Sequence, residues 1–502
     1  MTDRSSVLTG SYGRHVRTAI TAASIVALAA AVAAARAVAG RWRARGPSGF
    51  VENSVLMRNR HLAAIGARAG ARQVVHSARR VGATPQRRAE LDLEHQMRTA
   101  ADVASALGEL KGALMKLGQM ASYLDDGLPE PMRQALASLQ QDAPPMAPEL
   151  SAQIVREQLG NDPERVFAQW DPVPIAAASI GQVHRAVTHS GLRVAVKVQY
   201  PGIDEAIRAD LLNTDVIFRA LGLLFPGFEH GPLVEELRAR LVEELDYCIE
   251  ADNQRLFADW YADHPFIHVP RVIDELSTKR VLTTDFAEGA RFADVTVWAQ
   301  DERDAAAEAI FRFVFRSIYR LQSFNGDPHP GNYLFRPGGN VTFLDFGLVK
   351  RYTPTEVHLF QSLIEAFVID HDVTRFRHIL EANDVLKPSA ISDDDVGEYF
   401  GHFYEFVLED REIAFTPEYA SETVRRMFDV SSPYAHVAKS SNVPPAFVVT
   451  QRINLGLHAV LGQLRAKRNW RRIAFELWPF VDGEPSTPMG EAEAAWLEAH
   501  AR

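Results

Sequence analysis

Cysteine is almost absent from this 502-residue chain, in which Cys248 is the only one. A single thiol excludes an internal disulfide framework and a zinc site built from cysteines, and it is typical of a reducing compartment. Lysine is scarce too, with 8 residues against 46 arginines. Because arginine is the default cation of this chain, a lysine within a motif is more informative here than in an average protein.

Acidic residues are nearly missing from positions 1–88, which contain 15 arginines but only Asp3 and Glu52 as acids. This front end carries a formal charge of +13, so the rest of the chain carries −23 to give the net charge of −10. The asymmetry predicts an anionic surface as the partner of the front end alone. The length, with 47% hydrophobic and 24% charged residues, is typical of two globular lobes with extensions.

A long uncharged apolar run is found at residues 19–35, with arginines on both sides. Its seventeen residues are close to the lower limit for crossing a bilayer, and alanine contributes little transfer free energy. We expect residues 1–50 to form a membrane anchor, with a secretory signal peptide or a peripheral Ala-rich helix as alternatives. The higher arginine density after the run favours a membrane-associated protein whose active body is cytoplasmic.

Arginines continue through residues 51–98, which we interpret as a basic connector. Attraction to anionic lipid beside the apolar run is the simplest explanation, and a solvated linker is the alternative. Nucleic acid is not an expected partner, because the basic stretch has few aromatic residues and no recognisable binding motif.

Residues 99–165 have apolar side chains at helical spacing and are expected to form a helical extension. The extension contains Lys116 and Gln119 in the sequence Leu-Met-Lys-Leu-Gly-Gln. One lysine in an amphipathic helix is usually solvated. Here its flanks are apolar, which would bring Lys116 close to a protein surface and require a partner for its charge.

The next segment is rich in β-strand patterns. Residues 174–187 are typical of a strand, a tight loop and a strand, and the valines of residues 193–199 alternate as in a strand. The glycine-rich loop that covers ATP in kinases has the pattern G-x-G-x-x-G-x-V, with a lysine two strands later. Aligned with this sequence, the four fixed positions of the pattern fall on Ala176, Ala178, Gly181 and Val183. Lys197 then lies fourteen residues after Val183.

Alanine therefore replaces the first two glycines of that loop pattern. A Cβ atom disfavours positive φ and limits how closely the backbone approaches a phosphate, so we expect a stiffer loop. An Ala-rich hairpin alone would be a weak indication of function. The sequence Val-Ala-Val-Lys at the right distance makes it a moderate one.

Lys197, on a valine-rich strand, would be partly buried and needs an anionic partner. The helix expected at residues 233–260 offers Glu244, Asp246 and Glu250. Asp246 and Glu250 are one helical turn apart and would share a face, while Glu244 points partly elsewhere. The alternative is an exposed acidic helix without a role in a site.

Asp327 and Asn332 have the spacing D-x-x-x-x-N, and Asp345 begins Asp-Phe-Gly. Magnesium prefers hard oxygen ligands shared with phosphates, which an amide and a carboxylate from one hairpin would supply. Asp327 could accept a proton from an attacking hydroxyl or orient a water molecule. His329, between two prolines, is expected to shape the loop. Together with Lys197, these residues are a strong indication of phosphoryl transfer.

The remaining chain is expected to be mostly helical, beginning with a long helix at residues 300–323. Residues 286–480 would form the larger lobe. Residues 481–502 are acidic and contain proline, which predicts a loosely attached tail with one short helix.

These motifs together resemble the UbiB/ADCK-type atypical kinase family, also called AarF-domain-containing kinases. The resemblance is close over about residues 100–350. It implies an α+β, bilobal protein-kinase-like fold, with a β-rich N-lobe at 166–285, a helical C-lobe at 286–480 and the helical extension packed over the active site. It rests on the segments 116–119, 176–181, 194–197, 244–246, 326–332 and 345–347.

The resemblance also implies ATP and Mg²⁺ as cofactors. Lys116 and Gln119 would point into the nucleotide pocket, where Lys116 would meet Glu244 and Asp246. Lys197 would pair with Glu250 and reach the α- and β-phosphates. The catalytic residues would be Asp327, Lys197 and Lys116, and the magnesium ligands Asn332 and Asp345. The residues implied at the nucleotide are Ala176, Ala177, Ala178, Ser179, Gly181, Val183, Lys197, Glu250, Gln119, Glu244, Asp246 and, in the hinge segment that contacts adenine, Thr284 and Phe286.

We therefore expect an ATPase or small-molecule kinase that supports isoprenoid-quinone or other lipid metabolism at a membrane. Its partners would be ATP, a membrane lipid or isoprenoid-quinone precursor, and lipid-biosynthesis enzymes. A protein kinase is not expected, because the extension would cover the peptide groove and no Ala-Pro-Glu segment follows Asp345. The alternatives are a nucleotide-gated scaffold with little turnover and an aminoglycoside- or choline-type phosphotransferase.

Overall fold

The computed structural model describes residues 87, 146–178, 180–204, 242–326, 328–387, 391–428, 437 and 445–500, all within the compact unit Gly66–Arg502. The expected anchor, almost all of the connector and most of the helical extension lie outside the described residues. So do Lys116, Gln119, Ser179 and Asp327. Of the helices that are described, none has the length and hydrophobicity needed to cross a membrane.

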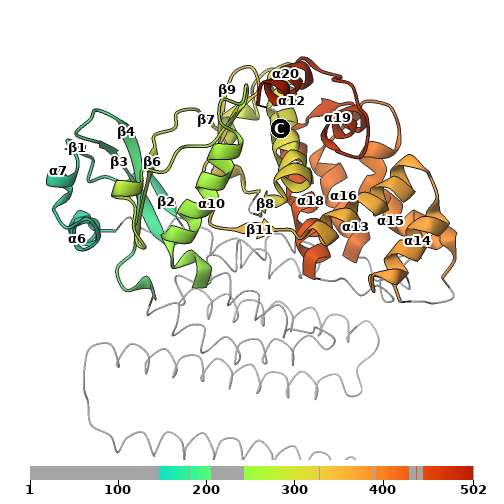
Figure 1. Cartoon of the computed structure of the whole chain (residues 1–502), viewed down its shortest axis with the longest axis horizontal. Helices are drawn as coiled ribbons and strands as arrows, with labels where there is room; N and C mark the ends of the chain where they lie inside the picture. The colour runs from blue at the N-terminus through green and yellow to red at the C-terminus, as the bar shows by residue number, and fades with distance from the viewer. Residues whose placement is uncertain are drawn as a thin grey trace, which may run out of the picture. The chain divides into compact units, whose positions relative to one another are not determined.

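The fold is a mixed α+β structure with a β-rich first part and a helical second part (Figure 1). The first part is an antiparallel sheet with the order β1-β3-β4-β6, in which β2 also pairs with β3. Its strands are β1 (Gln169–Trp170), β2 (Ala176–Ala178), β3 (Gly181–Val187), β4 (Arg193–Gln199) and β6 (Val281–Asp285).

The two faces of β4 explain where its lysine lies. Val194, Val196 and Val198 are fully buried on one face, where they pack with Ile154 and Val155 of α6 (Pro148–Leu159). Because side chains alternate along a strand, Lys197 lies on the opposite face. That face is turned toward α10 (Tyr247–Trp260), which stands between the sheet and the helical part (Figure 1).

Helix α10 begins at an aspartate cap. The side chain of Asp246 accepts a hydrogen bond from the Cys248 backbone N–H at 3.0 Å, and the Asp246 backbone is extended. The continuous helix predicted over residues 233–260 is therefore wrong at this point, because Asp at an N-cap adopts non-helical angles and satisfies a free N–H. Asp246 and Glu244 do not belong to the same helix as Glu250.

The second part is built around α12 (Gln300–Arg316), which is buried almost all round from Ala306 to Arg316. The second part also contains a small sheet with the order β5-β10-β9-β7 and the strand pair β8–β11. Arg291, Tyr333 and Leu334 of the small sheet line the cleft described below. These strands are β5 (Ile267–His268), β7 (Ala290–Arg291), β8 (Ser323–Asn325), β9 (Tyr333–Arg336), β10 (Asn340–Phe343) and β11 (Val349–Arg351). The surrounding helices are α11 (Phe292–Val295), α13 (Pro354–Ile364), α14 (Val373–Ala382), α15 (Asp393–Leu408), α16 (Pro417–Phe428), α18 (Pro445–Leu464), α19 (Trp470–Leu477) and α20 (Pro488–His500).

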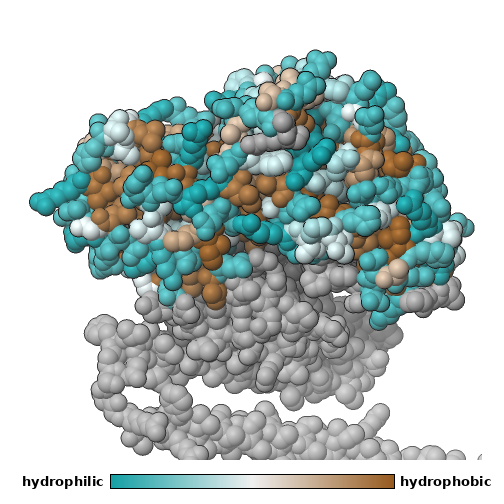
Figure 2. Space-filling model, viewed as in Figure 1, coloured by the Kyte–Doolittle hydropathy of each residue, from teal (hydrophilic) through white to brown (hydrophobic). Residues whose placement is uncertain are grey.

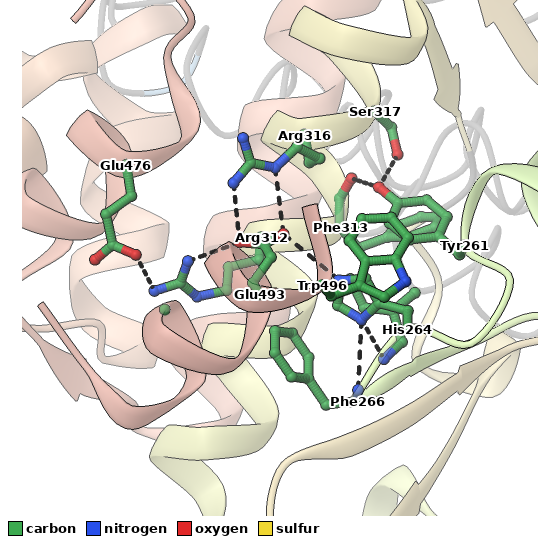
Figure 3. Close-up of polar contacts among 12 residues, drawn as sticks. Tyr261, His264, Phe266, Arg312, Phe313, Arg316, Ser317, Glu476, Glu493 and Trp496 are labelled. Atoms are coloured by element: carbon green, nitrogen blue, oxygen red, sulfur yellow. Dashed lines mark hydrogen bonds and ion pairs between the residues drawn. The ribbon is translucent and has the colours of Figure 1, made fainter. Parts of the chain in front are cut away.

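The acidic tail contains the predicted short helix, α20, but the expectation that it is loosely attached is wrong. Glu493 of α20 is 1% exposed and accepts hydrogen bonds from the buried guanidinium groups of Arg312 and Arg316 of α12 (Figure 3). Trp496 donates from Nε1 to the Ala262 carbonyl just beyond α10, at 3.0 Å. The acidic residue is buried because its charge is matched by arginines, a pairing that composition does not reveal.

Candidate functional site

A cleft of about 1480 Å³ lies between the sheet and the helical part. Most of the described residues that were predicted to bind nucleotide or metal line it. The face of the molecule shown in Figure 2 is mainly hydrophilic, with separate hydrophobic patches over the sheet, between the two parts and over the helices at the right of the view, around α14 and α15. The predicted residues that line the cleft are Ala176, Ala177, Ala178, Val183, Lys197, Glu250, Thr284, Phe286, Asn332 and Asp345.

An ion-pair cluster occupies the inner wall of this cleft. Lys197 of β4 donates from Nζ to both carboxylate oxygens of Glu250 on α10, at 2.7 and 2.9 Å. The same Nζ lies 3.7 Å from Oδ2 of Asp345 and 5.1 Å from the ring centre of Tyr247. The structure thus brings Lys197 and Glu250 together as expected, while their roles toward a nucleotide stay predictions.

The cluster keeps the lysine charged. Burial lowers the pKa of Lys197, but the carboxylates of Asp345 and Glu250 outweigh this effect and hold that pKa well above its usual value. Burial also raises the pKa of Glu250, against the opposing attraction of Lys197. The cleft therefore presents a fixed ammonium group between two acidic side chains.

The Asp-Phe-Gly segment is attached to the same helix. Phe346 is fully buried, with its ring centre 5.0 Å from that of Phe257 on α10, and its carbonyl accepts from Asn253 Nδ2 at 3.1 Å. Asp345 accepts from the Gly347 N–H at 2.9 Å through Oδ1. The position of α10 is thereby coupled to the position of Asp345. Asn253 was not among the residues predicted for the site, although it lies one helical turn after Glu250.

Asn332 and Asp345 lie at the same end of the β9–β10 hairpin. Phe343 pairs with Tyr333, and the next hydrogen bond runs from Leu344 N–H to the Asn332 carbonyl at 3.0 Å. An amide and a carboxylate that line one cleft are oxygen donors of the kind that magnesium prefers. The described residues contain no group of three His, Cys, Asp or Glu that could hold a metal by itself, so phosphate oxygens would have to complete such a site.

The loop before β9 is shaped by its histidine. His329 accepts a hydrogen bond from the Gly331 N–H at Nδ1, at 3.0 Å, and so closes the turn Pro330–Asn332. This bond agrees with the expected loop-shaping role. Asp327 lies outside the described residues, while on its N-terminal side Gly326 donates to the Leu348 carbonyl at 2.7 Å.

Three of the predicted residues that the structure describes do not line the cleft. Gly181 is buried, and a Cβ atom there would lie 2.3 Å from the Val198 carbonyl oxygen and 2.9 Å from Tyr247 Oη, so close packing requires the glycine. Asp246 caps α10 and lies 3.9 Å from Lys279 Nζ. Glu244 is likewise absent from the lining of the cleft.

The predicted hinge segment carries a feature that the sequence analysis missed. The guanidinium groups of Arg185 and Arg193 lie 4.9 and 5.9 Å from the ring centre of Phe286. Arg185, Thr284 and Phe286 all line the cleft. Cation–π contacts of this kind hold the aromatic ring in place at the edge of the cleft.

Comparisons with known proteins agree with these motifs. The sequence model described as "ABC1 atypical kinase-like domain" matches residues 138–380. The chain is 36% identical over 267 residues to AarF domain-containing protein kinase 1 of Mus musculus, covering 51% of this chain and 50% of that protein. It is 33% identical over 252 residues to atypical kinase COQ8B, mitochondrial, of Rattus norvegicus, covering 50% and 48%. The match therefore spans about half the length of these curated relatives.

A solved structure matches more of the chain. It is the complex of Rv3197 with erythromycin from Mycobacterium tuberculosis, which is 30% identical in sequence. The match has a TM-score of 0.58 and covers 78% of this chain and 98% of that one. The described fold is therefore shared beyond the residues that the family model covers.

Proposed function

Because the chain belongs to the ABC1/UbiB family of atypical kinases, we propose that it binds Mg-ATP in the cleft and acts on its terminal phosphate. The observation that supports this best is the Lys197–Glu250 pair beside Asp345. The phosphate oxygens of ATP need a cationic group, which the Lys197 ammonium supplies. A divalent cation needs oxygen ligands, which Asn332 and Asp345 supply at the end of the hairpin.

Each residue has a distinct part in this proposal. Lys197, oriented by Glu250, neutralises phosphate oxygens as a compact point charge. Asn332 and Asp345 would hold Mg²⁺, which neutralises phosphate charge when bound. Asp327, assigned from its spacing alone, would accept a proton from the attacking group or orient a water molecule.

The proposed acceptor is a small molecule or lipid, and the process supported is isoprenoid-quinone or other lipid metabolism at a membrane. The cleft volume of about 1480 Å³ exceeds the usual 300–1000 Å³ of a small-molecule site, which leaves room for a second ligand. Its walls include apolar residues such as Ile175, Leu282 and Leu334. One relative, from Rattus norvegicus, is named atypical kinase COQ8B, mitochondrial. We propose residues 1–50 as the segment that attaches the protein to the membrane.

The test is ATP turnover by the full-length protein with and without anionic liposomes and phenolic quinone-like headgroups. Asp345→Asn should abolish turnover, because it weakens the oxygen donor set. Asp394→Asn is the matched control, since Asp394 is exposed on α15. Unchanged turnover in Asp345→Asn would overturn the assignment. Tight ATP binding without turnover in any condition would instead favour the nucleotide-gated scaffold.

A further inference from the structure

Gln254, a residue that lines the cleft, has a buried polar atom with no hydrogen-bond partner among the described residues. Gln254 follows Glu250 by one turn of α10, lines the cleft and is 1% exposed. Its Nε2 donates to the Pro270 carbonyl at 2.7 Å. Its Oε1 is buried and accepts no hydrogen bond within the part of the chain that the structure describes.

The orientation of this amide is determined by its partner. A carbonyl can only accept, so the NH₂ group of Gln254 must face Pro270, and the oxygen is the atom left over. Leaving a buried amide oxygen without a donor destabilises the folded protein. An ordered water or a ligand donor at Oε1 would remove that cost.

The hydrogen-bond partner of Gln254 lies next to the hinge segment, which is the base side of the proposed nucleotide site. Pro270 precedes Arg271, whose carbonyl accepts a hydrogen bond from the Asp285 N–H at 2.9 Å. Thr284 of the hinge segment and Ala195 are cross-strand partners, and both line the cleft. The Lys197–Glu250 pair, one helical turn away, marks the phosphate side of the same wall.

We propose that Gln254 is a specificity-determining residue for the nucleotide base. Its Oε1 accepts a hydrogen bond from the exocyclic amino group of adenine. Guanine carries a carbonyl oxygen at the same ring position, and two acceptors facing each other repel, so GTP is disfavoured. The inference rests on the proposed function, because it requires a nucleotide in this cleft.

The experiment compares ATP with purine riboside triphosphate, which lacks only the amino group, by calorimetric titration of the full-length protein. The wild type should bind ATP about tenfold more tightly, the usual value of one hydrogen bond. Gln254→Met keeps the length of the side chain without an acceptor of similar strength, so it should bind both triphosphates about equally. Gln361→Met on α13, away from the cleft, should keep the tenfold preference.

Gln254→Met also removes the N–H group that donates to Pro270, which could destabilise the protein. Because the test compares the affinities of one variant for two triphosphates, such a loss of stability affects both affinities equally and cancels in their ratio. Gln254→Glu is a second variant for use at mildly acidic pH. Its protonated carboxyl group can donate to Pro270 and still present an acceptor, so it should retain the preference for ATP. Equal binding of both triphosphates by the wild type, or an unchanged preference in Gln254→Met, would overturn the inference and favour an ordered water. Binding of neither triphosphate would overturn the proposed function, and this inference with it.

Discussion

Arg312 and Glu493 are 181 residues apart in the sequence, yet Nη1 of the arginine donates to Oε2 of the glutamate at 2.9 Å. Both side chains are buried, and the contact joins α12, at the centre of the helical part, to the last helix, α20 (Figure 3). Burial alone would raise the pKa of Glu493, but Arg316, His264 and Arg312 hold it below its usual value. The C-terminal helix is thus an integral part of the fold.

Removing the charge of Glu493 tests this conclusion. Glu493→Gln leaves Arg312 and Arg316 buried with too little negative charge, which should cost about 3–5 kcal/mol of unfolding free energy. Denaturant unfolding of the full-length protein measures the loss. Glu412→Gln is the control, because Glu412 pairs with Lys467 on an exposed surface and its loss should change the midpoint little. Equal effects of the two substitutions would contradict the structural role of α20.

The central site residues could be predicted from the sequence because their geometry is local. Alternation along β4 places Lys197 on the face opposite Val196, and a short hairpin places Asn332 beside Asp345. Charge alone predicts that a half-buried ammonium needs an acid from the next helix, but it left Glu244, Asp246 and Glu250 open as partners. The choice of Glu250 came from the family resemblance.

Other features depend on contacts that sequence patterns do not encode. The composition of the acidic tail predicted a solvated segment. The arginines that neutralise Glu493 lie more than 170 residues earlier in the sequence, so no local pattern reveals the pairing. The break at Asp246 was missed because an acidic run is compatible with both a helix interior and a cap. Gln254 and Asn253 were missed because their importance arises from the atoms they face, Pro270 and Phe346.

The Lys197–Glu250 pair should be needed for ATP turnover. Glu250→Gln weakens the group that orients Lys197, and Lys197→Met removes the ammonium. Each should lower turnover by about 100-fold or more, because a preorganised charge at the phosphates is lost. Lys350→Met is the control, since Lys350 also pairs with a glutamate, Glu356, but does not line the cleft. A similar decrease in the control would show that general destabilisation causes the loss.

Gly456 of α18 should affect turnover more than ATP binding. A Cβ atom at this position would lie 2.4 Å from Cγ of Pro328, the residue after Asp327. Alanine in a helix gains about 1 kcal/mol of propensity, but this overlap forces the loop to move. A shift of about 1 Å in a catalytic group can cost 100-fold in rate. Gly401→Ala on α15, where the nearest atom is 3.4 Å away, should leave turnover unchanged, and an equally unaffected Gly456→Ala would contradict the coupling.

Stability should fall in mild acid because of His458, a buried residue of α18 whose ring lies near those of Phe406 and Phe415. Burial, and then the neighbouring His402, lowers its pKa from 6.5 to about 3. The unfolded chain therefore binds a proton below about pH 6.5 that the folded chain does not. The stabilisation is present above pH 6.5 and is lost as the pH falls toward 3, by up to about 1.4 kcal/mol per pH unit. Unfolding midpoints at pH 7, 6 and 5 should show a shallower pH dependence for His458→Phe than for the wild type. His358→Gln, at an exposed histidine of α13, should retain the wild-type slope, and an unchanged slope in His458→Phe would assign the acid sensitivity to other groups.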